Sequence, residues 1–226
     1  MVNRGTVFAI VGVVGKTFST SGAQRPSPSL VVLANEVGEA ITRQGHAVLT
    51  GGHVDRVETS VKYDALLGAF QAATLALPSR LIGILPASIS KALGRSASEP
   101  YVDVDCKPAV RQLYVHTMLT SEARNDITGQ TADVLIALEG GEGTASEVAV
   151  AMRAERPVVF LNSLAVLKPL VEANLKTTIS SPLQANSPQD AVNKALSVIG
   201  WGTPALKLRG SCPILTEDFN NKLQQL

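Results

Sequence analysis

The chain has 226 residues and a formal net charge of +1, a balance that argues against a dedicated nucleic-acid-binding surface because such surfaces normally carry a basic excess. No segment approaches the ~18 consecutive apolar residues of a membrane span, so we expect no membrane partner. Cys106 and Cys212 are too few and too far apart for a disulfide scaffold or a zinc site, and they are typical of a reducing, cytoplasmic compartment.

The first element of the chain is an apolar run at residues 6–14. With Arg4 before it and small residues at 21–23 after it, the run fits either a secretory signal peptide or a first strand that ends in a glycine-containing loop. We favour the strand, because the downstream pattern expects it as a central member of a sheet. The sequence Gly-Lys-Thr at 15–17 follows, but a P-loop would require glycine at position 10, where this chain has Ile10.

Beyond the first strand, short apolar runs alternate with segments of helical periodicity. The predicted strands cover residues 6–14, 47–50, 81–85, 101–106, 133–138, 158–162 and 177–179. The predicted helices cover residues 30–44, 59–76, 109–128, 145–155, 164–175 and 188–199, with a loop at 87–100. Ser29 is expected to cap the first helix and Gly45 to end it. The alternation predicts an α/β fold, a three-layer sandwich in which a central parallel sheet carries helices on both faces.

The end of the chain differs from the rest in composition. After the sequence Gly-Trp-Gly at 200–202, two prolines and a polar end replace the regular alternation of strands and helices. We therefore predict one domain over residues 1–202 and a C-terminal appendage over residues 203–226.

The most informative segment follows the predicted strand at 133–138, where the sequence Glu-Gly-Gly-Glu-Gly-Thr occupies residues 139–144. Glycine lets backbone approach a ligand closely, and a helix that begins at this point presents free N–H groups and a positive dipole end to an anion. An ordinary tight turn is the alternative, but three glycines in four residues exceed what a turn needs. We assign phosphate binding to Gly140, Gly141, Gly143 and Thr144, and expect Thr144 to open the helix.

A second pair of glycines, Gly51 and Gly52, ends the predicted strand at 47–50, at the edge of the sheet where α/β proteins bind ligands. We assign both of them, together with Gly12 in the first strand, to the same ligand site as the phosphate-binding glycines. The stretch that follows is either an altered wall of the substrate site or merely a longer loop. It contains the polar residues His53, Asp55, Arg56 and Lys62.

The pattern GG-x-GT-x-x-E at residues 140–147 resembles the signature of the LOG-like phosphoribohydrolases. Arg124 adds to the resemblance, because this family carries an arginine 16 residues before the first motif glycine and 23 before the glutamate, as Arg124 stands before Gly140 and Glu147. The resemblance covers roughly residues 5–200. It implies a Rossmann-like nucleotide-binding domain in a superfamily that also contains molybdenum-cofactor carriers and DprA-type DNA-processing proteins.

The resemblance implies catalytic roles for two residues. It places Glu147 at the ribose end of a nucleoside monophosphate and Arg124 over the glycosidic bond, where they would stabilise an oxocarbenium-like sugar and the departing base. Two simpler interpretations compete, since Thr144 and Glu147 fit a capping box and Arg124 fits a solvated helix charge. Asn125 stands where the family carries a lysine, so the site would lack one positive charge.

The function expected from the resemblance is hydrolysis of the N-glycosidic bond of a nucleoside 5′-monophosphate to free base and ribose 5-phosphate. The alternative is a non-catalytic nucleotide or molybdenum-cofactor carrier or sensor. The expected partner is a nucleotide or another phosphorylated small molecule, and a homodimer or larger homo-oligomer is expected because family members commonly form dimers. No cofactor is implied, and His46, His53 and His116 show no metal-ligand spacing.

Overall fold

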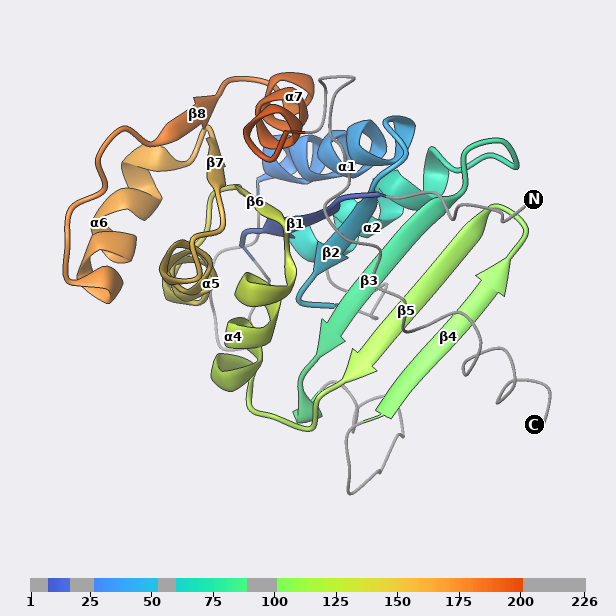
Figure 1. Ribbon diagram of the computed structural model, residues 1–226, viewed down its shortest axis with the longest axis horizontal. Helices are drawn as coiled ribbons and strands as arrows, with labels where there is room; N and C mark the ends of the chain where they lie inside the picture. The colour runs from blue at the N-terminus through green and yellow to red at the C-terminus, as the bar shows by residue number, and fades with distance from the viewer. Residues whose placement is uncertain (1–7, 17–26, 53–59, 89–100, 201–226) are drawn as a thin grey trace.

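The computed structural model describes residues 8–16, 27–52, 60–88 and 101–200. An eight-stranded sheet crosses the molecule (Figure 1). Its strands are β1 (Ile10–Val14), β2 (Ala47–Thr50), β3 (Ser79–Leu85), β4 (Tyr101–Lys107), β5 (Val110–His116), β6 (Val134–Ala137), β7 (Val158–Leu161) and β8 (Leu183–Ala185). The helices are α1 (Pro28–Arg43), α2 (Val61–Gln71), α4 (Ser121–Thr131), α5 (Glu142–Arg153), α6 (Leu164–Leu175) and α7 (Pro188–Val198).

The strand order across the sheet is β4-β5-β3-β2-β1-β6-β7-β8. Seven strands run parallel, and β4 pairs antiparallel with β5 at one edge. From β1 the chain adds β2 and β3 on one side, places β4 at the edge and β5 between β3 and β4, and then returns to β6 on the other side of β1. The strand order therefore reverses between β1 and β6. Open α/β sheets bind ligands beyond the carboxyl ends of the strands at such a reversal.

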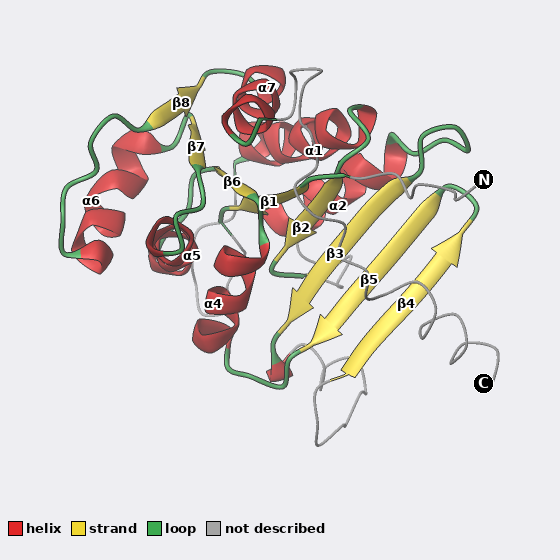
Figure 2. Ribbon diagram, in the orientation of Figure 1, coloured by secondary structure: helices red, strands yellow, loops and turns green. Residues whose placement is uncertain are grey.

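Helices cover both faces of the sheet (Figure 2). One core layer lies between the sheet and helices α1, α2 and α7, and it contains Val48 and Ile136. The other lies between the sheet and helices α4, α5 and α6, and it contains Leu135 and Phe160. Neighbours such as Leu135 and Ile136 enter different layers because successive side chains of a strand point to opposite faces. The predicted α/β fold, a Rossmann-like three-layer sandwich, is confirmed.

Helix α1 shows how local sequence sets its two ends. Ser27 caps the helix, with its Oγ accepting a hydrogen bond from the N–H of Leu30 at 3.2 Å. The prediction of Ser29 as the cap is wrong, because the helix already begins at Pro28, whose fixed φ suits the first helical position. Gly45 follows the last turn with a φ of +80°, as predicted.

The single long helix predicted at 109–128 is wrong. Residues 110–116 form β5, which pairs with β3 on one side and β4 on the other. Thr120 then starts α4, with its Oγ1 accepting a hydrogen bond from the N–H of Ala123 at 3.3 Å. The β-branched and aromatic residues of 110–116 favour a strand, and tertiary pairing on both sides overrides the helical pattern.

The strand predicted at 177–179 is also wrong, because the last strand is β8 at Leu183–Ala185. Lys176 ends α6 in the left-handed conformation, with a φ of 58°. The N–H of Ile179 then donates to Oε1 of Glu172 at 2.8 Å, so this segment closes the end of the helix instead of joining the sheet. Most of the loop predicted at 87–100 and the whole tail at 203–226 lie outside the described residues.

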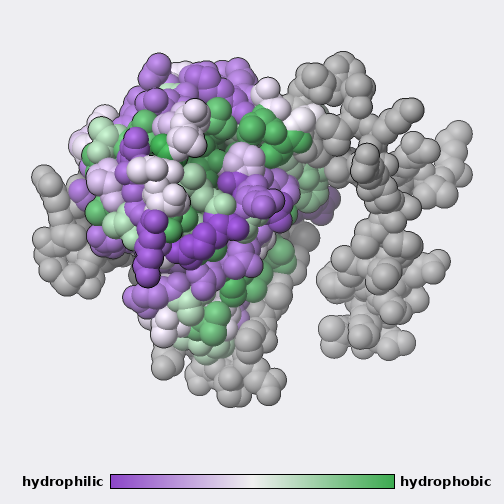
Figure 3. Space-filling view, turned by 60° about the vertical axis from the view of Figure 1, so that its left-hand side comes forward, coloured by the Kyte–Doolittle hydropathy of each residue, from purple (hydrophilic) through white to green (hydrophobic). Residues whose placement is uncertain are grey.

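The described surface mixes polar and apolar side chains, as Figure 3 shows for the side of the molecule that carries α6. Large exposed hydrophobic side chains stand on different elements, for example Val32 on α1, Phe70 on α2 and Val166 on α6. They therefore do not identify a contact surface, and the homo-oligomer stays a prediction. Of the helices described, none is long and apolar enough to cross a membrane.

Candidate functional site

Three connections meet at the carboxyl ends of the central strands. After β1, the N–H of Lys16 donates to the carbonyl of Glu139 at 2.7 Å, and the carbonyl of Lys16 accepts a hydrogen bond from the N–H of Val61 at 3.1 Å. Lys16 therefore joins the end of β6 to the start of α2. Gly15 permits this approach, because a Cβ there would lie 2.7 Å from Cγ1 of Val61.

The start of α5 is exposed at this edge. The helix begins at Glu142, and Gly141 precedes it without a side-chain cap. Gly141 and Gly143 are exposed, neither has a positive φ, and a Cβ added to either would meet no atom within 4 Å. The fold therefore does not require glycine at these two positions. Open space over uncapped helical N–H groups suits an anion.

Gly140 and Thr144 differ from their glycine neighbours, because packing explains them. Thr144 is buried in the first turn of α5, and a Cβ on Gly140 would overlap its Oγ1. Since the helix already begins at Glu142, the prediction that Thr144 opens it is wrong. The assignment of Gly140 and Thr144 to phosphate binding stays a prediction.

The predicted pair Arg124 and Glu147 is brought together from two helices, α4 and α5. Nη1 of Arg124 lies 2.6 Å from Oε1 of Glu147, and it also donates to Oγ1 of Thr128 at 3.2 Å. The two side chains are almost fully buried, Arg124 at 5% and Glu147 at 1% exposure. The interpretation of Arg124 as a solvated helix charge is wrong, because its side chain is buried. The interpretation of Thr144 and Glu147 as a capping box is also wrong, because Gly141 occupies the N-cap position of α5.

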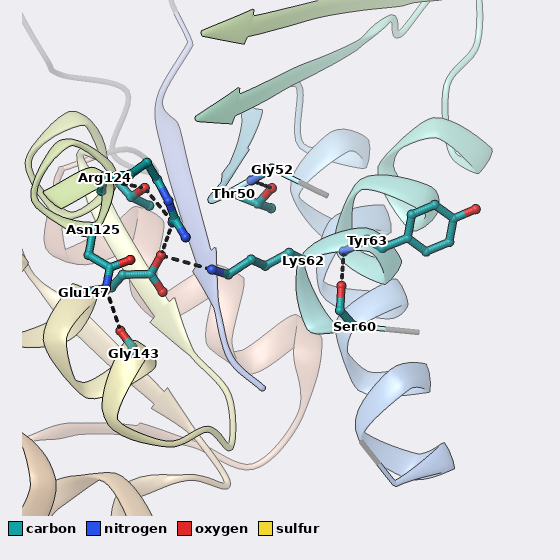
Figure 4. A network of polar contacts seen from close by, with 10 residues as sticks. Thr50, Gly52, Ser60, Lys62, Tyr63, Arg124, Asn125, Gly143 and Glu147 are labelled. Carbon is teal, nitrogen blue, oxygen red and sulfur yellow. Dashed lines mark hydrogen bonds and ion pairs between the residues drawn. The ribbon is translucent and has the colours of Figure 1, made fainter. Parts of the chain in front are cut away.

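Lys62 is a third member of the site, which the sequence analysis did not assign (Figure 4). It lies in the first turn of α2, is 7% exposed, and its Nζ lies 3.3 Å from the same Oε1 of Glu147. Burial lowers the pKa of the Lys62 ammonium; Glu147 acts to raise that pKa and Arg124 to lower it. A lysine in the first turn of a helix opposes the helix dipole, and this was the signal available in the sequence.

The glycines after β2 make room for this cluster. A Cβ on Gly51 would overlap Nη1 of Arg124 and lie 2.7 Å from Nζ of Lys62. Gly52 has a φ of +66°, and its N–H donates to Oγ1 of Thr50 at 3.1 Å, so it forms the turn that leaves the strand. Of the polar residues predicted in the stretch that follows, Lys62 lies at the site, whereas residues 53, 55 and 56 fall outside the described part of the chain.

Gly12 and Asn125 were also singled out in the sequence, and neither belongs to the cluster of Arg124, Lys62 and Glu147. Gly12 lies inside β1, where a Cβ would come within 2.8 Å of Cδ1 of Leu135, so apolar packing explains this glycine. Asn125 lies beside Arg124 on α4, and its Nδ2 donates to the carbonyl of Gly143 at 3.4 Å. Asn125 therefore contacts the first turn of α5 without adding a charge.

Among the described residues, no group of three or more His, Cys, Asp or Glu could hold a metal ion.

Comparison with known proteins identifies the kind of fold that carries this site. The model of the SLOG cluster4 family matches residues 8–192. The structure of the molybdenum cofactor binding protein from the phototrophic bacterium Rippkaea orientalis is 28% identical, with a TM-score of 0.61, over 85% of this chain and 98% of that one. The molybdenum cofactor carrier protein from Chlamydomonas reinhardtii is 27% identical, with a TM-score of 0.57, over 84% and 99%. No curated protein matches the sequence. The predicted resemblance to the LOG-like and molybdenum-cofactor carrier superfamily is confirmed.

Proposed function

We propose that this chain, which belongs to the SLOG cluster4 family, binds a phosphorylated small molecule as a carrier or binding protein. The phosphate would lie on the N-terminus of α5, with the rest of the ligand over the carboxyl ends of β1 and β2. The open space above Gly141 and Gly143 carries the proposal, because neither backbone conformation nor packing explains glycine there. Two relatives that are named as binding or carrying the molybdenum cofactor support a carrier or binding role.

Calorimetric titration with AMP and with adenosine tests the phosphate site. Wild-type protein should bind AMP at least about tenfold more tightly than adenosine, because charged hydrogen bonds contribute about 1.5–3 kcal/mol each and tenfold corresponds to about 1.4 kcal/mol. Gly143→Val should remove this advantage without lowering the melting temperature, since its Cβ enters open space. Equal affinity of the wild type for both ligands would contradict the proposal for nucleotides.

A co-elution experiment distinguishes the molybdenum cofactor from a nucleotide as the ligand. The chain is incubated with molybdenum cofactor released from a molybdoenzyme, passed through a gel-filtration column, and assayed for co-eluting molybdenum by mass spectrometry. Retention by the wild type and loss in Gly143→Val support a cofactor carrier. Retention of AMP without retention of molybdenum supports a nucleotide-binding protein.

Hydrolysis of a nucleoside 5′-monophosphate is the second candidate, and the contact of 2.6 Å between Arg124 and Glu147 favours it. A carboxylate beside the sugar stabilises an oxocarbenium-like state, and a cation assists the departing base. However, Oε1 of Glu147 is shared by Arg124 and Lys62. Two cations offset the field of the carboxylate at short range, so we expect slow hydrolysis at most. Chromatography of free base from a panel of monophosphates, with Glu147→Gln as the inactive control, tests this candidate.

A further inference from the structure

The buried cluster of Arg124, Lys62 and Glu147 contains more positive than negative charge. Both cations contact one carboxylate oxygen, and the three side chains are 5%, 7% and 1% exposed. Arg124 alone would neutralise Glu147, with a contact of 2.6 Å. Lys62 therefore adds a second buried cation, and a buried charge without its own counterion costs free energy.

Nothing else described nearby compensates this charge. Asp64, the next acid on α2, follows Lys62 by two residues, and side chains two apart on a helix do not face each other. In addition, Nε of Arg124 is buried and has no hydrogen-bond partner. The cluster therefore has both a surplus positive charge and an unused donor.

The position of the cluster relates it to the start of α5. Glu147 comes five residues after the first residue of α5, about 7.5 Å along the helix axis at a rise of 1.5 Å per residue. The two cations lie against Gly51 at the end of β2, where any side chain would displace them. A ligand with its phosphate at the helix N-terminus would thus extend toward the cluster.

We propose that Lys62 and Arg124 form a second anion subsite, so that the ligand carries a second negatively charged group besides the phosphate held at α5. This inference rests on the proposed function, because it places the phosphate first. It identifies the ligand class as a small molecule with anionic groups at two positions. Glu147 holds the two cations in place and accepts hydrogen bonds from neutral donors of the ligand.

Titration with adenosine 3′,5′-bisphosphate and with AMP tests the second subsite. Wild-type protein should bind the bisphosphate at least about tenfold more tightly than AMP, or about 1.4 kcal/mol. Lys62→Met should bring the ratio of the two affinities close to one. Lys168→Met is the matched control, because Lys168 is a surface residue of α6 that pairs with Glu172, and this variant should keep the wild-type ratio.

The outcomes separate this inference from the proposed function. A wild-type ratio near one overturns the second subsite, while tighter binding of AMP than of adenosine still upholds the phosphate site. A tenfold ratio that survives in Lys62→Met overturns the role of Lys62. If Lys62→Met does not fold, the wild-type ratio and Lys62→Arg, which should keep a preference for the bisphosphate, still decide the matter. Failure of the wild type to bind either nucleotide refutes both proposals for nucleotides.

Discussion

The connections from β2 to α2 and from β6 to α5 lie on either side of β1, and both contain glycines. The structure explains the glycines of the first connection but not the exposed glycines of the second. Gly51 is required by the two cations against it, and Gly52 by its positive φ. Gly141 and Gly143 are required by nothing described around them. A glycine that the fold explains is weak evidence for a ligand, whereas a glycine that the fold does not explain is stronger evidence.

The two helix starts differ in the same way. Ser60 caps α2, with its Oγ accepting a hydrogen bond from the N–H of Tyr63 at 3.1 Å. Both helices carry an acid in the first turn, Asp64 in α2 and Glu142 in α5, so the side-chain cap is what distinguishes them. The start of α5 has no side-chain cap. The β2–α2 connection is thus satisfied by its own side chains, whereas the β6–α5 connection leaves its N–H groups free for a ligand.

The largest effect is expected where the two connections meet. Glu147→Ala leaves Arg124 and Lys62 buried without their shared carboxylate, and breaking a buried pair costs about 3–5 kcal/mol of unfolding free energy. Urea denaturation measures this loss. Glu142→Ala, on the exposed first turn of the same helix, should cost a few tenths of a kcal/mol and serves as the control. Similar losses in both variants would show that the cluster contributes little to stability.

Gly51→Ala tests the β2–α2 connection directly. The new Cβ must displace Nη1 of Arg124 and Nζ of Lys62, so the ion pairs with Glu147 have to rearrange. Overpacking of this kind costs about 1–3 kcal/mol, measurable as a lower urea midpoint. Wild-type stability in this variant would mean that the cluster can shift freely, which would contradict its fixed arrangement.

Asp64→Asn tests the burial of an acid within α2. Burial raises the pKa of Asp64 to about 6, against a backbone hydrogen bond from Ser60 that lowers it. Because the folded pKa exceeds the unfolded value of 3.8, the stabilising contribution of the protonated group is complete below pH 3.8 and is lost as the pH rises through about 6. The difference in unfolding free energy between Asp64→Asn and the wild type should therefore favour the variant by about 1–2 kcal/mol more at pH 7.5 than at pH 4.5. Urea unfolding of both proteins at the two pH values measures this difference.

The sequence predicts the local features of this site better than its long-range contacts. The buried strand, the glycines and the helix at 133–155 follow from residues adjacent in the chain. The pairing of Arg124 with Glu147 was predicted because the resemblance supplied a spacing. The contact of Lys62 with Glu147 spans 85 residues and has no such pattern, so it emerges only when the fold brings α2 and α5 together.

The error at 109–128 has a related cause. Residues 111–115 of β5 are exposed or half-buried, so the strand lacks the alternation of buried and exposed positions that would identify it. Its stability comes from pairing with β3 and β4. Long-range pairing of this kind leaves little trace in a local periodicity.

The smallest stability effect is expected for Gly143→Ala, and its sign should oppose that of Gly51→Ala. The φ of Gly143 is not positive and its Cβ would meet nothing within 4 Å, so alanine fits the helix and reduces the entropy of the unfolded chain. A gain of about 0.4–1 kcal/mol should follow, measured by the same urea denaturation. Calorimetry should at the same time show weaker binding of AMP, because the methyl group occupies the space proposed for the phosphate. A variant that is more stable but binds AMP more weakly would show that Gly143 serves the ligand, whereas Gly51 serves the packing of the fold. Unchanged affinity would place the phosphate elsewhere on the carboxyl edge of the sheet.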